Sequence, residues 1–142
     1  MRRRTNLILL ALFPLLVLTA CATNYQREGV FSNGYSDFRL KEDTFVVTYR
    51  ANEHTSPEKV MQFALQRASE LTVQNGYRYF AIVDQIDTSR EHTVSKKQRE
   101  GNSETKIVSH LHYPSLRLTI QCFQEKPLHV ETIDAQRYLT YN

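Results

Sequence analysis

One capped amphipathic segment constrains the fold of this chain more than any other feature. Residues 55–76 read TSPEKVMQFALQRASELTVQNG, with Thr55 or Ser56 placed as a helix N-cap and Pro57 in the first turn. Asn75-Gly76 supplies residues that adopt the left-handed conformation at a helix end. Apolar residues recur at spacings of four, four and three and form one stripe: Val60, Ala64, Ala68 and Leu71. The segment is therefore predicted to be a helix that packs on a sheet through this stripe.

Segments on both sides of this helix have the alternating pattern of β-strands. Before it, FRL and TFVVTYRA flank Lys41-Glu42-Asp43, a polar connection of hairpin length. After it come YRYFAIVDQID and PSLRLTIQCF, and in the second of these apolar and polar residues alternate strictly. The strand, helix, strand order predicts a right-handed crossover. We expect an α+β domain with a small antiparallel-rich sheet, a ββαββ core and one long helix packed on one face.

Two later segments are mainly polar. Residues 88–106 read TSREHTVSKKQREGNSETK and are predicted to form a long mobile hairpin loop. The basic cluster Lys96-Lys97-Gln98-Arg99 in this segment is either a solvated run of charge or a contact for lipid phosphates. In the tail we expect a short strand around Val130 and a helical turn from Asp134.

The N-terminus has the three-part pattern of a secretory signal. Arg2 to Arg4 precede an apolar run from Leu7 to Leu18, and small residues follow it. The run has about 12 residues, whereas a helix that spans a bilayer needs about 20. We therefore expect residues 1–20 to direct export rather than to form a permanent transmembrane helix.

Leu18-Thr19-Ala20-Cys21 resembles the bacterial lipobox, in which a Leu three places before a Cys is followed by small residues. The resemblance implies cleavage between Ala20 and Cys21, a thioether-linked diacylglycerol on the Cys21 thiol and an N-palmitoyl group on the freed amine. The alternative is an ordinary signal peptide with an accidental Cys. Ala22 stands where an Asp would signal inner-membrane retention, so we expect the outer membrane, with the domain facing the periplasm. Several acyl chains would hold the protein in the bilayer durably.

The rest of the chain divides into a short linker and one domain. Residues 22–33, ATNYQREGVFSN, are polar and have no sustained period. We expect residues 21–33 to be a flexible lipidated tether and residues 34–142 to be a single α+β periplasmic domain, a division that suits the length of the chain.

Residues 34–83 carry a resemblance to a known family. They combine the opening GYSD, a strand ending in TYRAN, a helix with TSPEKV and ALQRASELT, and the sequence NGYRYFAIV after it. This block resembles the CC0125/CC1285 family of bacterial lipoproteins, in which a Tyr-Ser-Asp opening precedes a helix containing RAAELT and then Gly-Tyr-x-Tyr-Phe. Ser69 stands where a second Ala is common in that family. The resemblance implies an envelope lipoprotein and a fold, but the family has no established activity and provides no catalytic residue.

Several residues are candidates for chemistry, each with a structural alternative. Tyr35-Ser36-Asp37 places a hydroxyl beside an acid, but adjacent strand residues point to opposite faces, so we expect a turn or strand-start role. His110 and His112 have the spacing of metal ligands on one strand face, but no third ligand is evident, and we expect them to be solvated. Cys122 lies among apolar residues and is expected to be a buried, inert thiol.

The composition excludes some functional classes. The chain has 18 Lys and Arg against 15 Asp and Glu, and Arg2, Arg3 and Arg4 account for the whole excess. Without residues 1–20 the net charge is zero, which argues against a nucleic-acid partner. No glycine-rich phosphate loop, paired-Cys metal motif or nucleophile elbow is present, so we expect neither an enzyme nor a cofactor.

The remaining hypothesis is an outer-membrane lipoprotein that acts as a non-catalytic binding or structural component of the envelope. Its partners would be the lipid bilayer, through the acyl anchor, and an envelope protein. The alternative is a periplasmic stress sensor or assembly factor that acts through a protein partner, and a third is an undetected hydrolase. Exposed aromatic surface near Tyr77 and Tyr79 would favour a protein partner, whereas a deep pocket with converging polar groups would favour catalysis.

Overall fold

The computed structural model describes residues 22–30, 33–101 and 103–142. The predicted hairpin is present: β1 (Gly34–Arg39) pairs antiparallel with β2 (Thr44–Arg50) around the Lys41-Glu42-Asp43 connection. Phe45, Val47 and Tyr49 form the face of β2 that lies in the hydrophobic core, as their alternating pattern predicts. Val46 and Thr48 on the opposite face are buried as well.

The predicted helix is α1 (Pro57–Gln74), which has 18 residues. At its start the Ser56 hydroxyl accepts a hydrogen bond from the amide of Lys59 at 3.2 Å. At its end Asn75 is the C-cap and Gly76 has a φ of 80°, so the left-handed stop is also confirmed. The predicted stripe is buried together with other residues of the same face: Val60, Phe63, Ala64, Ala68, Ser69, Leu71 and Thr72.

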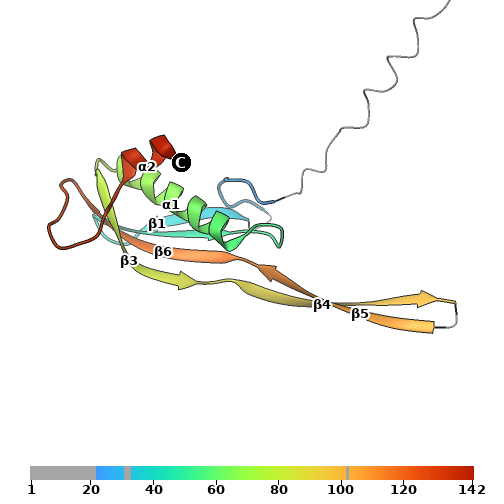
Figure 1. Ribbon diagram of the computed structural model, residues 1–142. Helices are drawn as coiled ribbons and strands as arrows, with labels where there is room; N and C mark the ends of the chain where they lie inside the picture. Colours follow the sequence, from blue (N-terminus) through green and yellow to red (C-terminus); the bar gives the residue numbers. More distant parts are fainter. Residues whose placement is uncertain (1–21, 31–32, 102) are drawn as a thin grey trace, which may run out of the picture.

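The sheet has the strand order β1-β2-β6-β3-β7. β3 (Tyr79–Asp87) follows α1 in the chain, and β6 (Ser115–Phe123) pairs antiparallel with both β2 and β3. β2 and β3 are therefore parallel to each other with β6 between them, and α1 lies across one face of this sheet (Figure 1). These strands and helices make the chain an α+β protein with antiparallel pairing between neighbouring strands, as expected.

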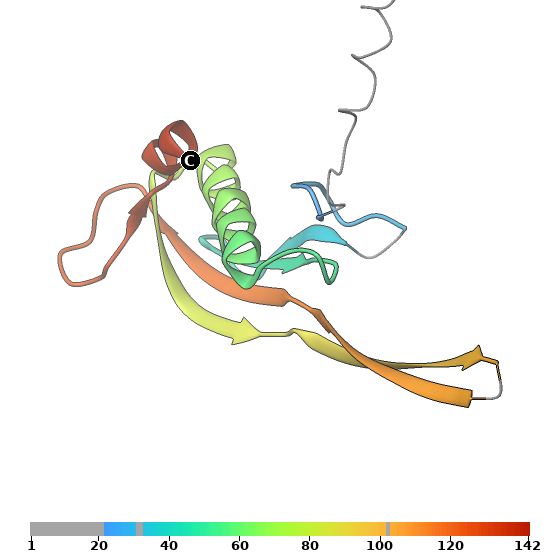
Figure 2. The same ribbon diagram turned by 45° about the vertical axis from the view of Figure 1, so that its right-hand side comes forward.

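The hairpin predicted at residues 88–106 is present, but it consists of paired strands and not of the predicted loop. This part of the chain forms β4 (Arg90–Glu100) and most of β5 (Ser103–Tyr113), which pair antiparallel as a separate two-stranded sheet. We call residues 90–113 the arm, and the five-stranded sheet with its helices the body. The arm continues the direction of β3 and β6 and extends well away from the body (Figures 1 and 2). The polar composition that suggested a loop instead reflects strands exposed to solvent.

The tail differs from the prediction in one detail. The short strand lies not around Val130 but at β7 (Ile133–Asp134), which pairs with the start of β3. The predicted helical turn is α2 (Ala135–Tyr141), and the Asp134 carboxylate caps it by accepting from the amide of Arg137 at 3.1 Å. Tyr138 of α2 donates to the carbonyl of Gln62, so α2 packs beside α1.

The described part of the expected tether, residues 22–30 and 33, is not free of the domain. Tyr25 packs against the core, and Thr23 is 7% exposed. Among the residues that the structure describes, no helix combines the length and the apolar character needed to cross a membrane.

Candidate functional site

The predicted lipid attachment and cleavage positions, Cys21 and Ala20, lie outside the described residues. The lipid anchor therefore stays a prediction from the sequence. The residues directly after it are described, and they show where the chain enters the domain.

Thr23 forms hydrogen bonds that attach the beginning of the described chain to the loop between β2 and α1. Its amide donates to Thr55 Oγ1 at 2.9 Å, and its own hydroxyl oxygen accepts from the amide of Asn52 at 2.8 Å. Asn52 Oδ1 in turn accepts from the Thr55 hydroxyl at 2.9 Å. These hydrogen bonds place Thr23 at the end of the body where α1 begins.

Tyr25 adds a partly buried aromatic contact two residues later. Its ring stacks on Tyr35 at 5.1 Å between centroids and lies 5.6 Å from Phe63, which in turn lies 5.0 Å from Tyr49. The Tyr25 hydroxyl donates to Glu70 at 2.5 Å. Burial, together with this bond to a carboxylate, raises the pKa of Tyr25 well above its ordinary value. Residue 25 is therefore packed against the core and is not part of a free linker.

An ion-pair network lies beside this aromatic cluster. Arg67 of α1 donates to Asp37 at 2.8 Å and to Glu70 at 2.9 Å, and its guanidinium lies 4.6 Å from the centre of the Tyr35 ring. Burial alone would lower the pKa of Arg67, but the hydrogen bonds to both carboxylates raise it. Asp37 therefore holds β1 to α1, which fits the structural role expected for Tyr35-Ser36-Asp37.

Backbone and side-chain bonds hold the following residues against β1 and β2. Tyr35 exchanges hydrogen bonds with the backbone of Gln26 and Glu28, and both Glu28 carboxylate oxygens accept from Arg50 Nη1 at 2.7 Å. Gly34 has a φ of 122°, and a Cβ atom there would lie 2.4 Å from the carbonyl oxygen of Gln26. The close approach of the two segments therefore requires glycine at position 34.

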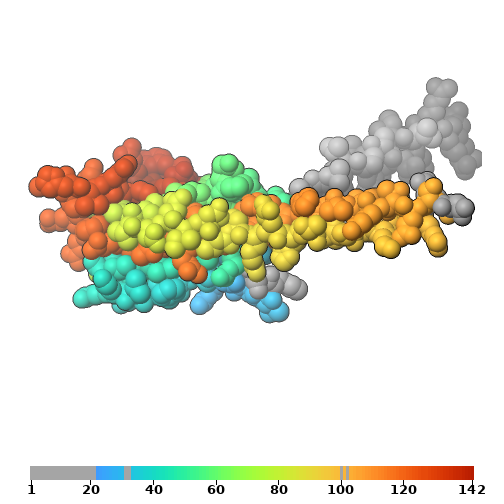
Figure 3. All heavy atoms as spheres, turned by 90° about the horizontal axis from the view of Figure 1, so that it is seen from below, coloured from blue at the N-terminus to red at the C-terminus, as the bar shows by residue number. Residues whose placement is uncertain are grey.

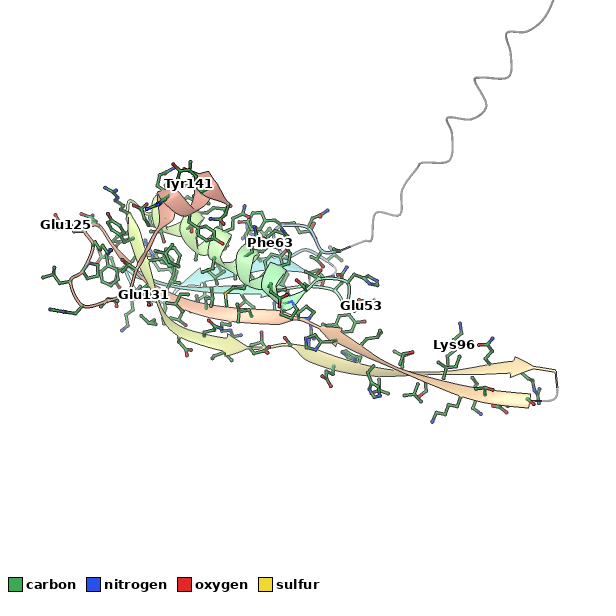
Figure 4. The ribbon with its side chains drawn as sticks, viewed as in Figure 1. Glu53, Phe63, Lys96, Glu125, Glu131 and Tyr141 are labelled. Atoms are coloured by element: carbon green, nitrogen blue, oxygen red, sulfur yellow. The ribbon has the colours of Figure 1, made fainter. Side chains whose placement is uncertain are left out.

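The root of the arm, where β3 continues into β4 and β5 into β6, lies at this same end of the body. The amide of Ala51 donates to the carbonyl of Pro114 at 2.9 Å, next to the Asn52 amide that binds Thr23. Pro114 joins β5 to β6, and the amide of Thr88, between β3 and β4, donates to Ser115 at 2.9 Å. Figure 4 shows Glu53, from the loop that binds Thr23, near the root of the arm, whereas Glu125, Glu131 and Tyr141 lie at the opposite end.

The register of the arm separates its side chains into two faces, because residues directly opposite one another in an antiparallel ladder share a face. The tyrosine face holds the pairs Arg90/Tyr113, His92/Leu111, Val94/Ser109, Lys96/Ile107 and Gln98/Thr105. The histidine face holds the pairs Glu91/His112, Thr93/His110, Ser95/Val108, Lys97/Lys106 and Arg99/Glu104.

His110 and His112 share the histidine face, as their spacing predicts for an extended segment. His110 Nδ1 lies 3.2 Å from the Thr93 hydroxyl, and His112 Nδ1 lies 3.9 Å from a carboxylate oxygen of Glu91. Within the described ranges, no group of three or more His, Cys, Asp or Glu side chains could hold a metal ion. The structure therefore brings the two histidines together without completing a metal site around them.

The distal half of the histidine face is cationic. Lys97 and Lys106 are directly opposite, a pairing of like charges that destabilises a strand pair. Lys97 forms an ion pair with Glu104 at 2.9 Å, and Arg99 lies opposite the same glutamate. One carboxylate thus lies among three cationic side chains, and Lys106 has no carboxylate within ion-pair distance among the side chains that the structure describes.

A groove of about 450 Å³ lies at the opposite end, beside α2. Tyr79, Lys126, Asp134 and Arg137 are among its lining residues. Asp134 already caps α2 and pairs with Arg78 at 3.3 Å, and the bond from the Arg137 amide lowers the pKa of this carboxylate. Tyr77 and Tyr79 are both partly buried, whereas Tyr141, which lines the same groove as Tyr79, is 78% exposed.

Cys122 is buried on the core face of β6, as expected. Its sulfur lies 3.5 Å from the Thr72 hydroxyl, and burial raises the pKa of the thiol. A neutral thiol inside the core is a poor nucleophile, which agrees with an inert structural role.

Sequence reasoning missed two features of this end of the molecule, the docking of residues 23–28 and the strands of the arm. One signal for the first was Tyr25, a large aromatic residue in an otherwise polar stretch. A signal for the second was the run TKIVSHLHY, which is rich in residues that favour strands.

Comparisons of the chain with family models, curated proteins and solved structures find no match. The resemblance to the CC0125/CC1285 family therefore stays a prediction from residues 34–83 and the lipobox. Those fifty residues span β1, β2, α1 and the first half of β3.

Proposed function

We propose that this chain is a lipoprotein of the outer membrane, anchored through Cys21 and facing the periplasm, and that it acts as a non-catalytic binding or structural component. The lipobox-like residues 18–21 support the anchor. In this proposal the body is a rigid support and the arm is the element that makes contact.

The arm is the observation that supports binding over catalysis. It consists of two 11-residue strands that form their own two-stranded sheet outside the five-stranded sheet. An isolated hairpin is only marginally stable in water, because it has no core of its own. A chain that places so many residues in such an element is best explained by a surface that the arm contacts.

The alternative of an assembly factor or stress sensor with a protein partner has one favourable observation. In a two-stranded sheet each strand keeps one unpaired edge, which can accept a further strand from another protein. A hydrolase has less support, because Asp37 is held by Arg67 and the groove carboxylate of Asp134 is held by Arg78 and the start of α2.

Palmitate labelling with membrane fractionation of the full chain tests the anchor. Cys21→Ala should abolish labelling and leave an uncleaved precursor, because the lipid acceptor is lost. The matched variant Cys122→Ala removes the buried thiol and should leave labelling and sorting unchanged. Label that persists in Cys21→Ala, or disappears in Cys122→Ala, would contradict the anchor assignment.

Photocrosslinking in cells tests whether the arm makes the contact. A photoreactive residue in place of Gln98, on the arm, should give crosslinked products, whereas one in place of the exposed Gln136 of α2 should give few. Equal yields at both positions would show that the arm is not the contact element.

A further inference from the structure

The docking of residues 23–28 determines which end of the domain faces the membrane, provided that the anchor of the proposed function is correct. Thr23 is bonded to the loop between β2 and α1, and only Ala22 separates it from Cys21. Two peptide units span at most about 7 Å. A lipid on Cys21 would therefore hold this end of the body directly at the bilayer surface, not on the twelve-residue tether expected from the sequence.

The arm leaves the body at that same end. Ala51 binds Pro114 at the root of the arm, and its neighbour Asn52 binds Thr23. From this root an 11-residue strand pair extends about 36 Å. Figure 3 shows the arm as a slender projection that continues beyond the bulk of the body. The arm therefore starts at the end of the body that faces the membrane and extends outward from it. In this position the arm lies against the lipid surface along its length.

The charge of the arm fits the headgroup layer of that surface. Lys97, Arg99 and Lys106 lie together on the distal histidine face, with Glu104 as the carboxylate between them. A phosphate group placed there would relieve the repulsion between the opposed lysines, and the guanidinium of Arg99 suits phosphate oxygens. Charged side chains on both strands exclude burial of the arm in the hydrocarbon layer.

We propose that the distal histidine face of the arm, through Lys97, Arg99 and Lys106, binds the phosphates of lipid headgroups in the leaflet that holds the anchor. The chain then contacts the bilayer at two places, the lipid at Cys21 and the far end of the arm. The body is held between them in one orientation.

Fluorescence quenching on vesicles tests this contact with the full-length lipidated chain. Gln98→Cys provides a thiol on the opposite, tyrosine face, to which a fluorophore is attached. The buried Cys122 should not react with the fluorophore. Two kinds of vesicle contain a lipid with a quencher on its headgroup. The anionic vesicles consist of phosphatidylglycerol and phosphatidylcholine, and the neutral vesicles consist of phosphatidylcholine alone. We expect strong quenching on the anionic vesicles, at least several-fold weaker quenching on the neutral ones, and loss of the difference in 1 M salt, where screening acts within about 3 Å.

A matched pair of triple variants separates this site from net charge. Lys97→Gln with Arg99→Gln and Lys106→Gln should remove most of the quenching. The control Lys41→Gln with Lys126→Gln and Arg137→Gln makes the same change of charge on exposed positions of the body and should keep the quenching. Equal quenching on both vesicle types, or equal effects of both triple variants, would overturn the proposal. Energy transfer between arms of different copies without lipid quenching would also overturn it and would indicate pairing of the arm with a second copy.

Flotation of the same samples separates this proposal from the proposed function. A lipid anchor keeps the chain on vesicles in 1 M salt. If flotation in high salt fails, the anchor is wrong. The arm contact is then supported only if the chain still floats with anionic vesicles in low salt and the arm triple variant does not, and it is overturned otherwise.

Discussion

β6 and β5 are two halves of one nearly continuous extended segment, separated by Pro114, yet they have opposite environments. In β6, Leu118, Ile120 and Cys122 are buried under α1, whereas in β5 Ile107 and Val108 are 43% and 47% exposed. Both halves are paired along their length, β6 with β2 and β3, and β5 with β4.

The two halves have the same extended backbone conformation and differ in whether a helix packs on them. β6 alternates between apolar and polar residues because one side meets a helix, and β5 lacks that alternation because neither side does. A polar run between two strands can therefore be strand itself when the flanking strands already hold it in register. Gly101, with a φ of 61°, turns the chain at the tip.

The largest effect on stability is expected when an aspartate is placed in β6, and the same substitution in β5 is the comparison. Leu118→Asp puts an unpaired carboxylate in the fully buried part of β6, which costs several kcal/mol against a total stability of about 5 to 15 kcal/mol, so the domain should unfold. Leu71→Asp, on the facing stripe of α1, should do the same. Val108→Asp on β5 should change the free energy of unfolding by less than about 0.5 kcal/mol. Urea denaturation followed by circular dichroism measures all three, and an unchanged midpoint for Leu118→Asp would refute the described core.

A second test asks whether the N-terminal segment belongs to the body. Tyr25→Ala removes a ring that packs on Tyr35 and Phe63 and a hydroxyl that binds Glu70, so we expect a loss of about 3 kcal/mol. Tyr141→Ala removes a side chain that is 78% exposed and should have little effect. Equal midpoints for the two variants would mean that residue 25 behaves as part of a free tether after all.

The third test uses pH, because Tyr49 titrates inside the body. Burial raises the pKa of Tyr49 to about 12, above the ordinary value near 10. Its contribution is fully present below pH 10, and as pH rises toward 12 the unfolded chain loses its proton first, so the stability falls by about 2 kcal/mol. Alkaline denaturation curves measure this slope.

Tyr49→Phe should reduce that alkaline slope without abolishing it, because the pKa values of Tyr25 and Tyr138 are also raised by burial. It also loses the hydrogen bond from the hydroxyl to the carbonyl of Asn24. The buried-core variant Phe45→Leu lowers stability at neutral pH without removing a phenol and should retain the slope. A slope that is unchanged in Tyr49→Phe would show that Tyr49 does not contribute to it.

The smallest effect is expected at the histidines of the arm. His112→Ala should leave the unfolding midpoint of the body unchanged, because the side chain is half exposed and its nearest carboxylate, of Glu91, is 3.9 Å away. Neither the natural chain nor the variant should retain stoichiometric zinc through dialysis. Zinc that is retained and then lost in His112→Ala would show that the arm holds a metal site.

The local pattern of the sequence predicted most of the elements of the body. α1 was located to its caps because Ser56, Pro57, Asn75 and Gly76 act through bonds and torsions within a few residues. The strands before and after it were identified because apolar residues recur at every second position, which is clearest in β6, where one face is buried and the other is partly exposed. The small groove beside α2 had no such local pattern, since its lining comes from β3, the loop before β7 and α2.

The sequence by itself determined the capped helix, the alternating strands and the buried position of Cys122. The export signal and the lipobox-like Cys21 stay predictions from the sequence. Only the tertiary structure decided that β6 lies between β2 and β3, that residues 90–100 and 103–113 form strands and that residues 23–28 pack against the body. The physical reason is the range of the interactions. Periods and caps depend on neighbours in the chain, whereas the bonds of Thr23 to Asn52 and of Tyr25 to Glu70 join residues 29 and 45 positions apart and depend on the assembled fold.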